Sequence, residues 1–125
     1  MDLLHQEITD KILKAFYNVY RELGYGFLEK VYENALSYEL VSFGLDCKTQ
    51  CPIDVYYCDR KVGQYFADII VNDCVILELK AAESICEEHE FQLINYLKAT
   101  NIEVGLLLNF GKKPSHKRKI FTNKQ

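Results

Sequence analysis

The chain has 125 residues, of which 49% are hydrophobic and 26% are charged, with a formal net charge of −3 at pH 7. This length and composition predict one folded domain over 1–125 and exclude a disordered chain. No apolar run approaches the roughly 18–20 residues of a membrane-spanning helix, and residues 1–7 lack the basic start and apolar stretch of a signal peptide. We therefore expect a cytoplasmic protein without a membrane partner.

The charges are unevenly distributed along the chain. Residues 1–103 carry a formal charge of −9, whereas 104–125 carry +6 and contain no acid. Such a split indicates a local basic feature on an acidic body, here the C-terminal segment 110–125. Its candidate contacts to a nucleic-acid backbone are Lys112, Lys113, Lys117, Arg118 and Lys119. The alternative is a solvated tail that aids solubility.

Two helices are predicted at the start of the chain. Apolar residues at helical spacing run over 8–23 and end at Gly24, and a second helical stretch covers 27–43 and ends at Gly44. One stripe of the second helix begins with Glu29 and is otherwise apolar or aromatic. A carboxylate in that position is unfavourable unless something binds it.

The rest of the chain alternates strands with one more helix. Runs rich in Ile, Val and Tyr, separated by turn residues, predict strands at 45–57, 62–71, 74–80 and 103–109, a helix at about 86–99, and a short final strand at 117–122. Pro52 marks a bulge or an edge strand. The sequence thus predicts an α/β domain with a mixed sheet flanked by helices. We expect strand 74–80 to run parallel to strand 103–109, because a helix connects them.

Three charged residues interrupt these strands. Side chains of a strand alternate between faces, so Glu78 and Lys80 point the same way. A two-residue loop at Asn72 would place Asp68 on the other face, whereas a three-residue connection through Cys74 places it opposite Glu78, and Phe66 opposite Lys80. Two facing carboxylates repel unless a cation lies between them. We therefore expect the three-residue connection.

Two carboxylates with open positions for water and phosphate suit Mg²⁺ or Mn²⁺ better than zinc. The alternative for Glu78 and Lys80 is an ordinary ion pair on a solvated edge strand. Asp68 in the preceding strand and Glu29 on an apolar stripe favour the metal site. On the following helix, His89, Gln92 and Tyr96 share one stripe, which could hydrogen-bond a phosphate or be a polar surface.

Together these motifs resemble a known family. An Asp, nine residues and then Glu-x-Lys, here Asp68, Glu78 and Lys80, resemble the PD-(D/E)XK nuclease superfamily. The segment from Gly26 through Glu29 to Tyr32 fits the G-x-x-E-x-x-Y signature of one bacterial family within it. The resemblance covers residues 5 to 122 and implies a restriction-endonuclease-like αβββαβ core.

The resemblance also implies roles for single residues. Asp68 and Glu78 would bind the metal together with the backbone carbonyl of Leu79, and Lys80 would be the catalytic lysine. Glu29 would be the acid supplied by the N-terminal helix, aiding metal or water binding. Supporting roles fall to Tyr32, to His89, and to Gln92 and Tyr96, which resemble the helix motif of RecB-type exonucleases.

The function implied is a nuclease, dependent on Mg²⁺ or Mn²⁺, that hydrolyses DNA in repair, recombination or defence. RNA stays open as a substrate. The set of acids and lysine also resembles small archaeal Holliday-junction resolvases, which act as dimers, so a homodimer is an expectation too. The alternative is a catalytically inactive nucleic-acid-binding or interaction module with the same fold.

Overall fold

The computed structural model describes residues 3–122, and its elements follow the predicted order. The elements are α1 (Gln6–Leu23), α2 (Glu29–Ser42), β1 (Cys47–Tyr57), β2 (Arg60–Val71), β3 (Val75–Lys80), α3 (Glu87–Lys98), β4 (Val104–Phe110) and β5 (Pro114–Ile120). The final strand begins three residues before the predicted one. The predicted α/β class is confirmed.

The strands form one mixed sheet in the order β1-β2-β3-β4-β5. Only β3 and β4 are parallel, as expected from the helix that connects them, and the other neighbours are antiparallel. Pro52 lies in β1, which is an edge strand and so tolerates the missing N–H. Every residue of β4, an interior strand, is buried.

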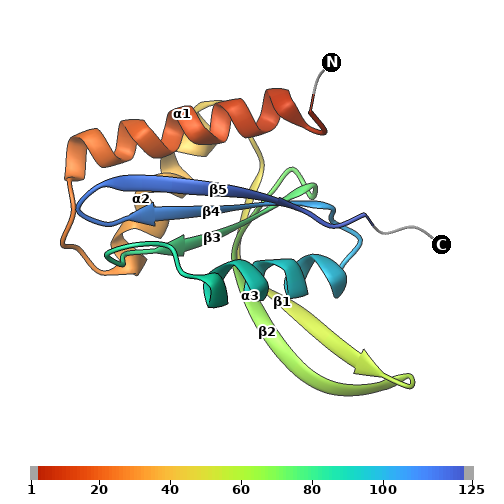
Figure 1. Ribbon diagram of the computed structural model, residues 1–125. Coiled ribbons are helices and arrows are strands. Elements are labelled where there is room, and N and C mark those ends of the chain that lie inside the picture. Colours follow the sequence, from red (N-terminus) through yellow and green to blue (C-terminus); the bar gives the residue numbers. More distant parts are fainter. Residues whose placement is uncertain (1–2, 123–125) are drawn as a thin grey trace.

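Helices cover both faces of the sheet (Figure 1). On one face, α1 and α2 contribute Phe16 and Leu36 to a core that includes Leu77 of β3. On the other face, α3 packs Leu93 and Leu97 into a second core. Glu78 and Lys80 alternate with Leu77 along β3, so they lie on the α3 side.

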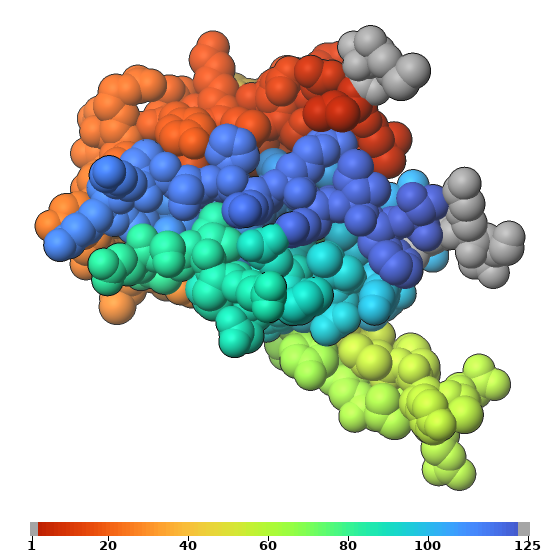
Figure 2. All heavy atoms as spheres, in the orientation of Figure 1, coloured from red at the N-terminus to blue at the C-terminus, as the bar shows by residue number. Residues whose placement is uncertain are grey.

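The hairpin of β1 and β2 bends as it leaves the sheet. Gln50 has a φ of 49°, in the left-handed region that non-glycine residues seldom adopt. Across this bend Cys47 contacts the α1/α2 core, whereas Ile53 belongs to the α3 core. Beyond it, residues 51–67, which we call the arm, project away from the body beside α3 (Figures 1 and 2).

The connection from β2 to β3 has three residues, as predicted. Asn72 and Asp73 have φ values of 51° and 55°, and the Cys74 N–H donates to the Val71 carbonyl at 3.0 Å. Val71 then pairs with Val75, which fixes the register that brings Asp68 opposite Glu78. The predicted pairing of Phe66 with Lys80 is wrong. The β2–β3 ladder stops at Ile69, and Phe66 pairs with Pro52 in the arm.

Candidate active site

The site begins where β2 and β3 separate. The Asp68 main-chain N–H donates to the Glu78 carboxylate at 2.9 Å, and the Leu79 main-chain N–H donates to the Asp68 carboxylate at 2.8 Å. Each carboxylate therefore takes the place of a backbone partner on the opposite strand. This exchange ends the ladder and holds the two acids at the fork between the strands.

The two acids are held where full ionisation is unfavourable. Burial and, to a smaller extent, the negative charge of Asp68 raise the pKa of Glu78 to about 8, although the hydrogen bond from the Asp68 N–H and the charge of Lys80 act in the opposite direction. Burial likewise raises the pKa of Asp68, against the hydrogen bond from Leu79. Only 4% of Glu78 is exposed. A cation between the carboxylates would relieve both effects.

This donor set fits a hard divalent cation. Carboxylate oxygens are the preferred ligands of Mg²⁺, which also keeps several waters in its coordination shell. Within residues 3–122, no three His, Cys, Asp or Glu side chains converge closely enough to complete a metal site by themselves. A cation held by Asp68 and Glu78 would therefore need further ligands, such as water, a backbone carbonyl or phosphate oxygens. The carbonyl of Leu79 as a ligand stays a prediction.

Glu29, the predicted acid on α2, is exposed, although its spacing placed it on the apolar stripe of the helix. Glu29 is exposed at the first residue of α2, where the helix dipole favours a negative charge. Its predicted place on a buried stripe is thus wrong, because the first helical turn extends past the packed face that begins at Tyr32. Its charge still reaches the site, since it raises the pKa values of Asp68 and Glu78.

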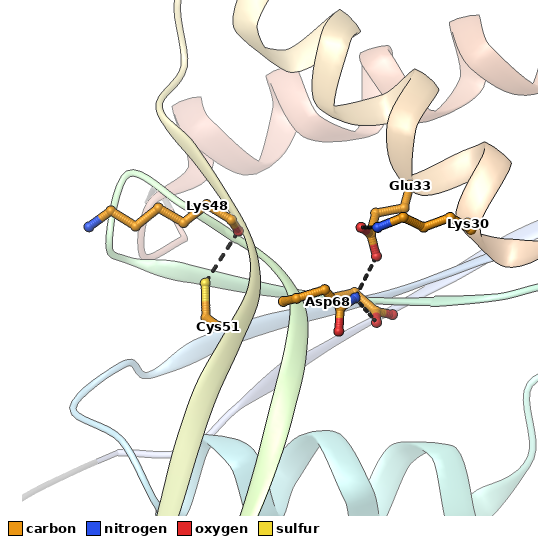
Figure 3. Close-up of polar contacts among 6 residues, drawn as sticks. Lys30, Glu33, Lys48, Cys51 and Asp68 are labelled. Atoms are coloured by element: carbon orange, nitrogen blue, oxygen red, sulfur yellow. Dashed lines mark hydrogen bonds and ion pairs between the residues drawn. The ribbon is translucent and has the colours of Figure 1, made fainter.

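A second glutamate on α2, which the sequence analysis missed, is the buried one. Glu33 is 4% exposed and accepts hydrogen bonds from Lys30 at 2.8 Å and from Gln50 at 2.7 Å. The same Gln50 amide lies 3.4 Å from the Asp68 carboxylate. Figure 3 shows Glu33 and Lys30 approaching Asp68 from α2. The Gln50 side chain thus links Glu33 of α2 to Asp68. The left-handed backbone at Gln50 is part of the bend that holds its amide between these two carboxylates.

Lys80 is the last residue of β3, and a buried amide fixes the chain just beyond it. Asn109, the β4 partner of Lys80, accepts a hydrogen bond from the Ala82 N–H and donates one to the Ala82 carbonyl, at 2.9 and 3.0 Å. Lys80 itself is half-buried, and among residues 3–122 no ion pair or hydrogen bond occupies its ammonium group. That group is available to a ligand at the fork.

The three residues of the predicted stripe on α3 have two different roles. Gln92 donates to the Tyr96 hydroxyl at 2.9 Å. Burial and the charges of Glu78 and Asp68 raise the pKa of Tyr96 to about 12, so its phenol is near the acids and stays protonated. His89 instead caps the helix, because its ring accepts the Cys86 N–H at 3.3 Å.

Tyr32 supports the loop that leads to Glu29. Its ring is fully buried and stacks on Phe110 with centroids 4.2 Å apart. Its hydroxyl donates to the Gly24 carbonyl at 2.6 Å and accepts the Phe27 N–H at 3.2 Å. Gly26 within this loop has a φ of 110°, which favours glycine. Glycine and tyrosine of the motif therefore shape the chain that begins α2 at Glu29.

The basic residues near the C-terminus do not form one surface. Lys117 and Lys119 both contact Glu90 of α3, the former at 3.9 Å. Arg118 projects from the opposite face of β5 and donates to the Leu4 carbonyl at 2.7 Å. Lys112 and Lys113 are exposed in the turn between β4 and β5. The structure therefore separates the five predicted contacts into three places.

None of the helices in the described range 3–122 is both long and apolar enough to cross a membrane.

Comparisons with known proteins agree with this geometry. A family model described as the PD-(D/E)XK nuclease superfamily matches residues 6–120. Among solved structures, the chain is similar to one described as "Crystal structure of SSO0001", with a TM-score of 0.56 and 18% sequence identity, over 76% of this chain and 50% of that chain. The chain thus spans half the length of that protein, and the likeness concerns the fold. No curated protein matches the chain.

Proposed function

The chain belongs to the PD-(D/E)XK nuclease superfamily, and from this premise we propose that it is a metal-dependent nuclease that hydrolyses phosphodiester bonds of DNA. The observation that supports the proposal best is the fork between β2 and β3. There, two carboxylates with raised pKa values, Asp68 and Glu78, accompany the ammonium group of Lys80, which acts on Glu78 by its charge but makes no hydrogen bond or ion pair with residues 3–122. In a purely structural ion pair, the lysine would contact the acids directly and would lower their pKa values instead of leaving them raised.

Asp68 and Glu78 are the proposed ligands of Mg²⁺ or Mn²⁺, and the Leu79 carbonyl and Glu29 are the proposed additions to this set. Such an ion polarises a phosphodiester and lowers the pKa of a bound water. Lys80 would orient the attacking water or neutralise the charge that develops on the phosphate. Glu33 and Gln50 would keep Asp68 in place through the hydrogen bonds described above.

Tyr96 and Gln92 would bind the phosphate from the α3 side. The Tyr96 hydroxyl, whose pKa is raised to about 12, is protonated at neutral pH as an ordinary phenol is. It accepts a hydrogen bond from Gln92, so its own hydrogen is free to donate. A protonated phenol beside two acids is suited to a phosphate oxygen, which accepts hydrogen bonds and carries negative charge.

The finer assignments belong to the same proposal. Gly26, Glu29 and Tyr32 favour the G-x-x-E-x-x-Y group within the superfamily. We further propose that 1–125 acts as one catalytic domain in the cytoplasm, that it pairs as a homodimer to hold duplex DNA, and that it serves repair, recombination or defence.

The test incubates purified protein with Mg²⁺ or Mn²⁺ and four labelled substrates: single-stranded, duplex and branched DNA, and RNA. We expect cleavage of DNA that EDTA abolishes and that Lys80→Ala reduces at least about 100-fold. Lys14→Ala, which changes an exposed lysine on α1, is the matched control and should cleave as the wild type does.

Cleavage that survives both EDTA and Lys80→Ala would rule out the proposed site. DNA binding without cleavage of any substrate would support the inactive binding module. Absence of both binding and cleavage would leave an interaction protein.

A further inference from the structure

A groove lies between the arm and α3, on the side of the sheet that carries Glu78. Its volume is about 860 Å³, within the range of roughly 300–1,000 Å³ that is usual for small-molecule and cofactor sites. Four aromatic rings line it, from the arm and from α3: Tyr56, Tyr65, Phe91 and Tyr96. Figure 2 shows the arm standing away from the body beside α3, which leaves this space open.

Three of these rings, those of Tyr56, Tyr65 and Phe91, are exposed to solvent, whereas Tyr96 is 5% exposed and belongs to the α3 core. Tyr65 is 51% exposed and Phe91 is 58% exposed, although both are large and mainly apolar. Tyr65 lies 5.7 Å from Tyr96, centroid to centroid, and tilted against it. Such a surface offers π faces on which a flat ligand can stack.

The groove adjoins the candidate active site. Tyr96 lines it and belongs to the same core as Ile76, which lies two residues before Glu78 on β3. Tyr65, which also lines it, lies three residues before Asp68 on β2. A strand whose phosphate lies at the acids therefore has neighbouring nucleotides near the groove, which connects the occupant of the groove to the substrate of the site.

The charges of the groove select the part of a nucleotide that enters. Asp54 and Glu88 line it together with Lys98, and Asp54 is ion-paired with Lys61 at 3.2 Å, so the lining carries no excess of positive charge. Such a lining offers phosphate groups no net attraction, whereas neutral bases need none. The amides of Gln92 and Asn95 add donors and acceptors that match base edges. A base-paired duplex presents its phosphates and hides its base faces, so it fits poorly.

We propose that this groove binds unpaired bases next to the scissile phosphate, by stacking them on Tyr65 and Phe91. The proposal rests on the proposed nuclease function and specifies its substrate as a strand with unpaired nucleotides at the cut. The bend at Gln50, which turns the arm toward α3, creates the binding surface.

Fluorescence anisotropy in EDTA, where no hydrolysis occurs, tests the groove separately from catalysis. The probes are a fluorescein-labelled oligothymidylate, a strand of abasic sites of equal length, and a duplex. We expect Tyr65→Ala and Phe91→Ala each to weaken oligothymidylate binding about 5- to 100-fold. Both side chains are exposed, so these variants should fold, which circular dichroism verifies.

The matched control is Tyr57→Ala, an even more exposed aromatic on the same arm outside the groove. It should bind the oligothymidylate within about twofold of the wild type. The abasic strand should bind wild type and Phe91→Ala alike, because it has the phosphates without the bases. Equal losses for the abasic strand or the duplex, or no loss for oligothymidylate, would overturn the proposal.

The two proposals fail in different ways. DNA cleavage that is abolished by Lys80→Ala but unaffected by Phe91→Ala, with unchanged anisotropy, would overturn the groove and leave the nuclease. The expected anisotropy pattern without any cleavage would overturn the nuclease and leave a site for unpaired bases.

Discussion

A single glycine sets how closely the end of β4 approaches the loop after Lys80. A Cβ atom on Gly111 would lie 2.1 Å from the Ala82 carbonyl oxygen, a backbone atom that Asn109 already holds. We expect Gly111→Ala to lower the free energy of unfolding by about 1–3 kcal/mol, because overpacking forces the backbone to move. Urea unfolding measures this loss, and the displaced loop should also slow DNA cleavage.

Gly63→Ala is the matched control in the arm. Its added Cβ meets nothing nearer than a Tyr65 ring atom at 4.0 Å. Alanine there should leave stability unchanged or raise it by up to about 1 kcal/mol, through the reduced entropy of the unfolded chain. Equal stability of the Gly111 and Gly63 variants would show that the Ala82 contact is not tight.

Single residues of the candidate site also show what the periodicity of the sequence can and cannot predict. Alternation along 74–80 and the length of the preceding turn were enough to bring Asp68 opposite Glu78. Glu33 and Gln50 were missed, because their importance depends on how α2 packs against the bend. Asn, Asp or Gly would have signalled a left-handed residue, whereas Gln carries no such signal.

At the scale of elements, β5 and the turn before it carry cations of two kinds, structural and exposed. Arg118 and Lys119 are held by Leu4 and Glu90, whereas Lys112 and Lys113 in the preceding turn are exposed. We expect the double variant Lys112→Ala/Lys113→Ala to weaken DNA binding and to reduce the slope of log affinity against log salt by about 1–2. Its unfolding free energy should stay unchanged.

Arg118→Ala should show the opposite result. It removes the hydrogen bond that joins β5 to the start of α1, at a cost of about 1–2 kcal/mol in stability. The salt dependence of its DNA binding should match that of the wild type. A changed salt slope in Arg118→Ala, with intact stability, would assign this residue to the nucleic-acid surface instead.

The bounds of the helices and strands were predicted better than their arrangement in space. Helical spacing and strand composition located the three helices and five strands of residues 3–122 to within about three residues. The arm could not be foreseen, since both of its strands have ordinary β composition. Its direction follows from the conformation of Gln50 and from the exchange of hydrogen bonds at Asp68, which are tertiary effects.

At the scale of the whole molecule, the acid pair connects catalysis to stability. Glu78 has a pKa near 8 in the folded chain and an ordinary value of 4.5 when unfolded. Between these values the folded state binds more protons, so the unfolding free energy falls as the pH rises through this window. Asp68, whose pKa is also raised, acts in the same direction. The metal-free protein should thus be most stable on the acid side of the window.

Urea unfolding in EDTA at pH 5.5, 7 and 8.5 tests this expectation. The loss of stability should approach but not exceed about 1.4 kcal/mol per pH unit for each proton involved. Mg²⁺ should restore stability at pH 8.5, since it binds the folded acids and not the unfolded chain. Glu78→Gln should flatten the pH dependence and remove most of the Mg²⁺ effect, whereas Glu22→Gln on the exposed side of α1 should change neither. A pH slope that Glu78→Gln leaves intact would mean that the buried acid pair is not what destabilises the metal-free fold.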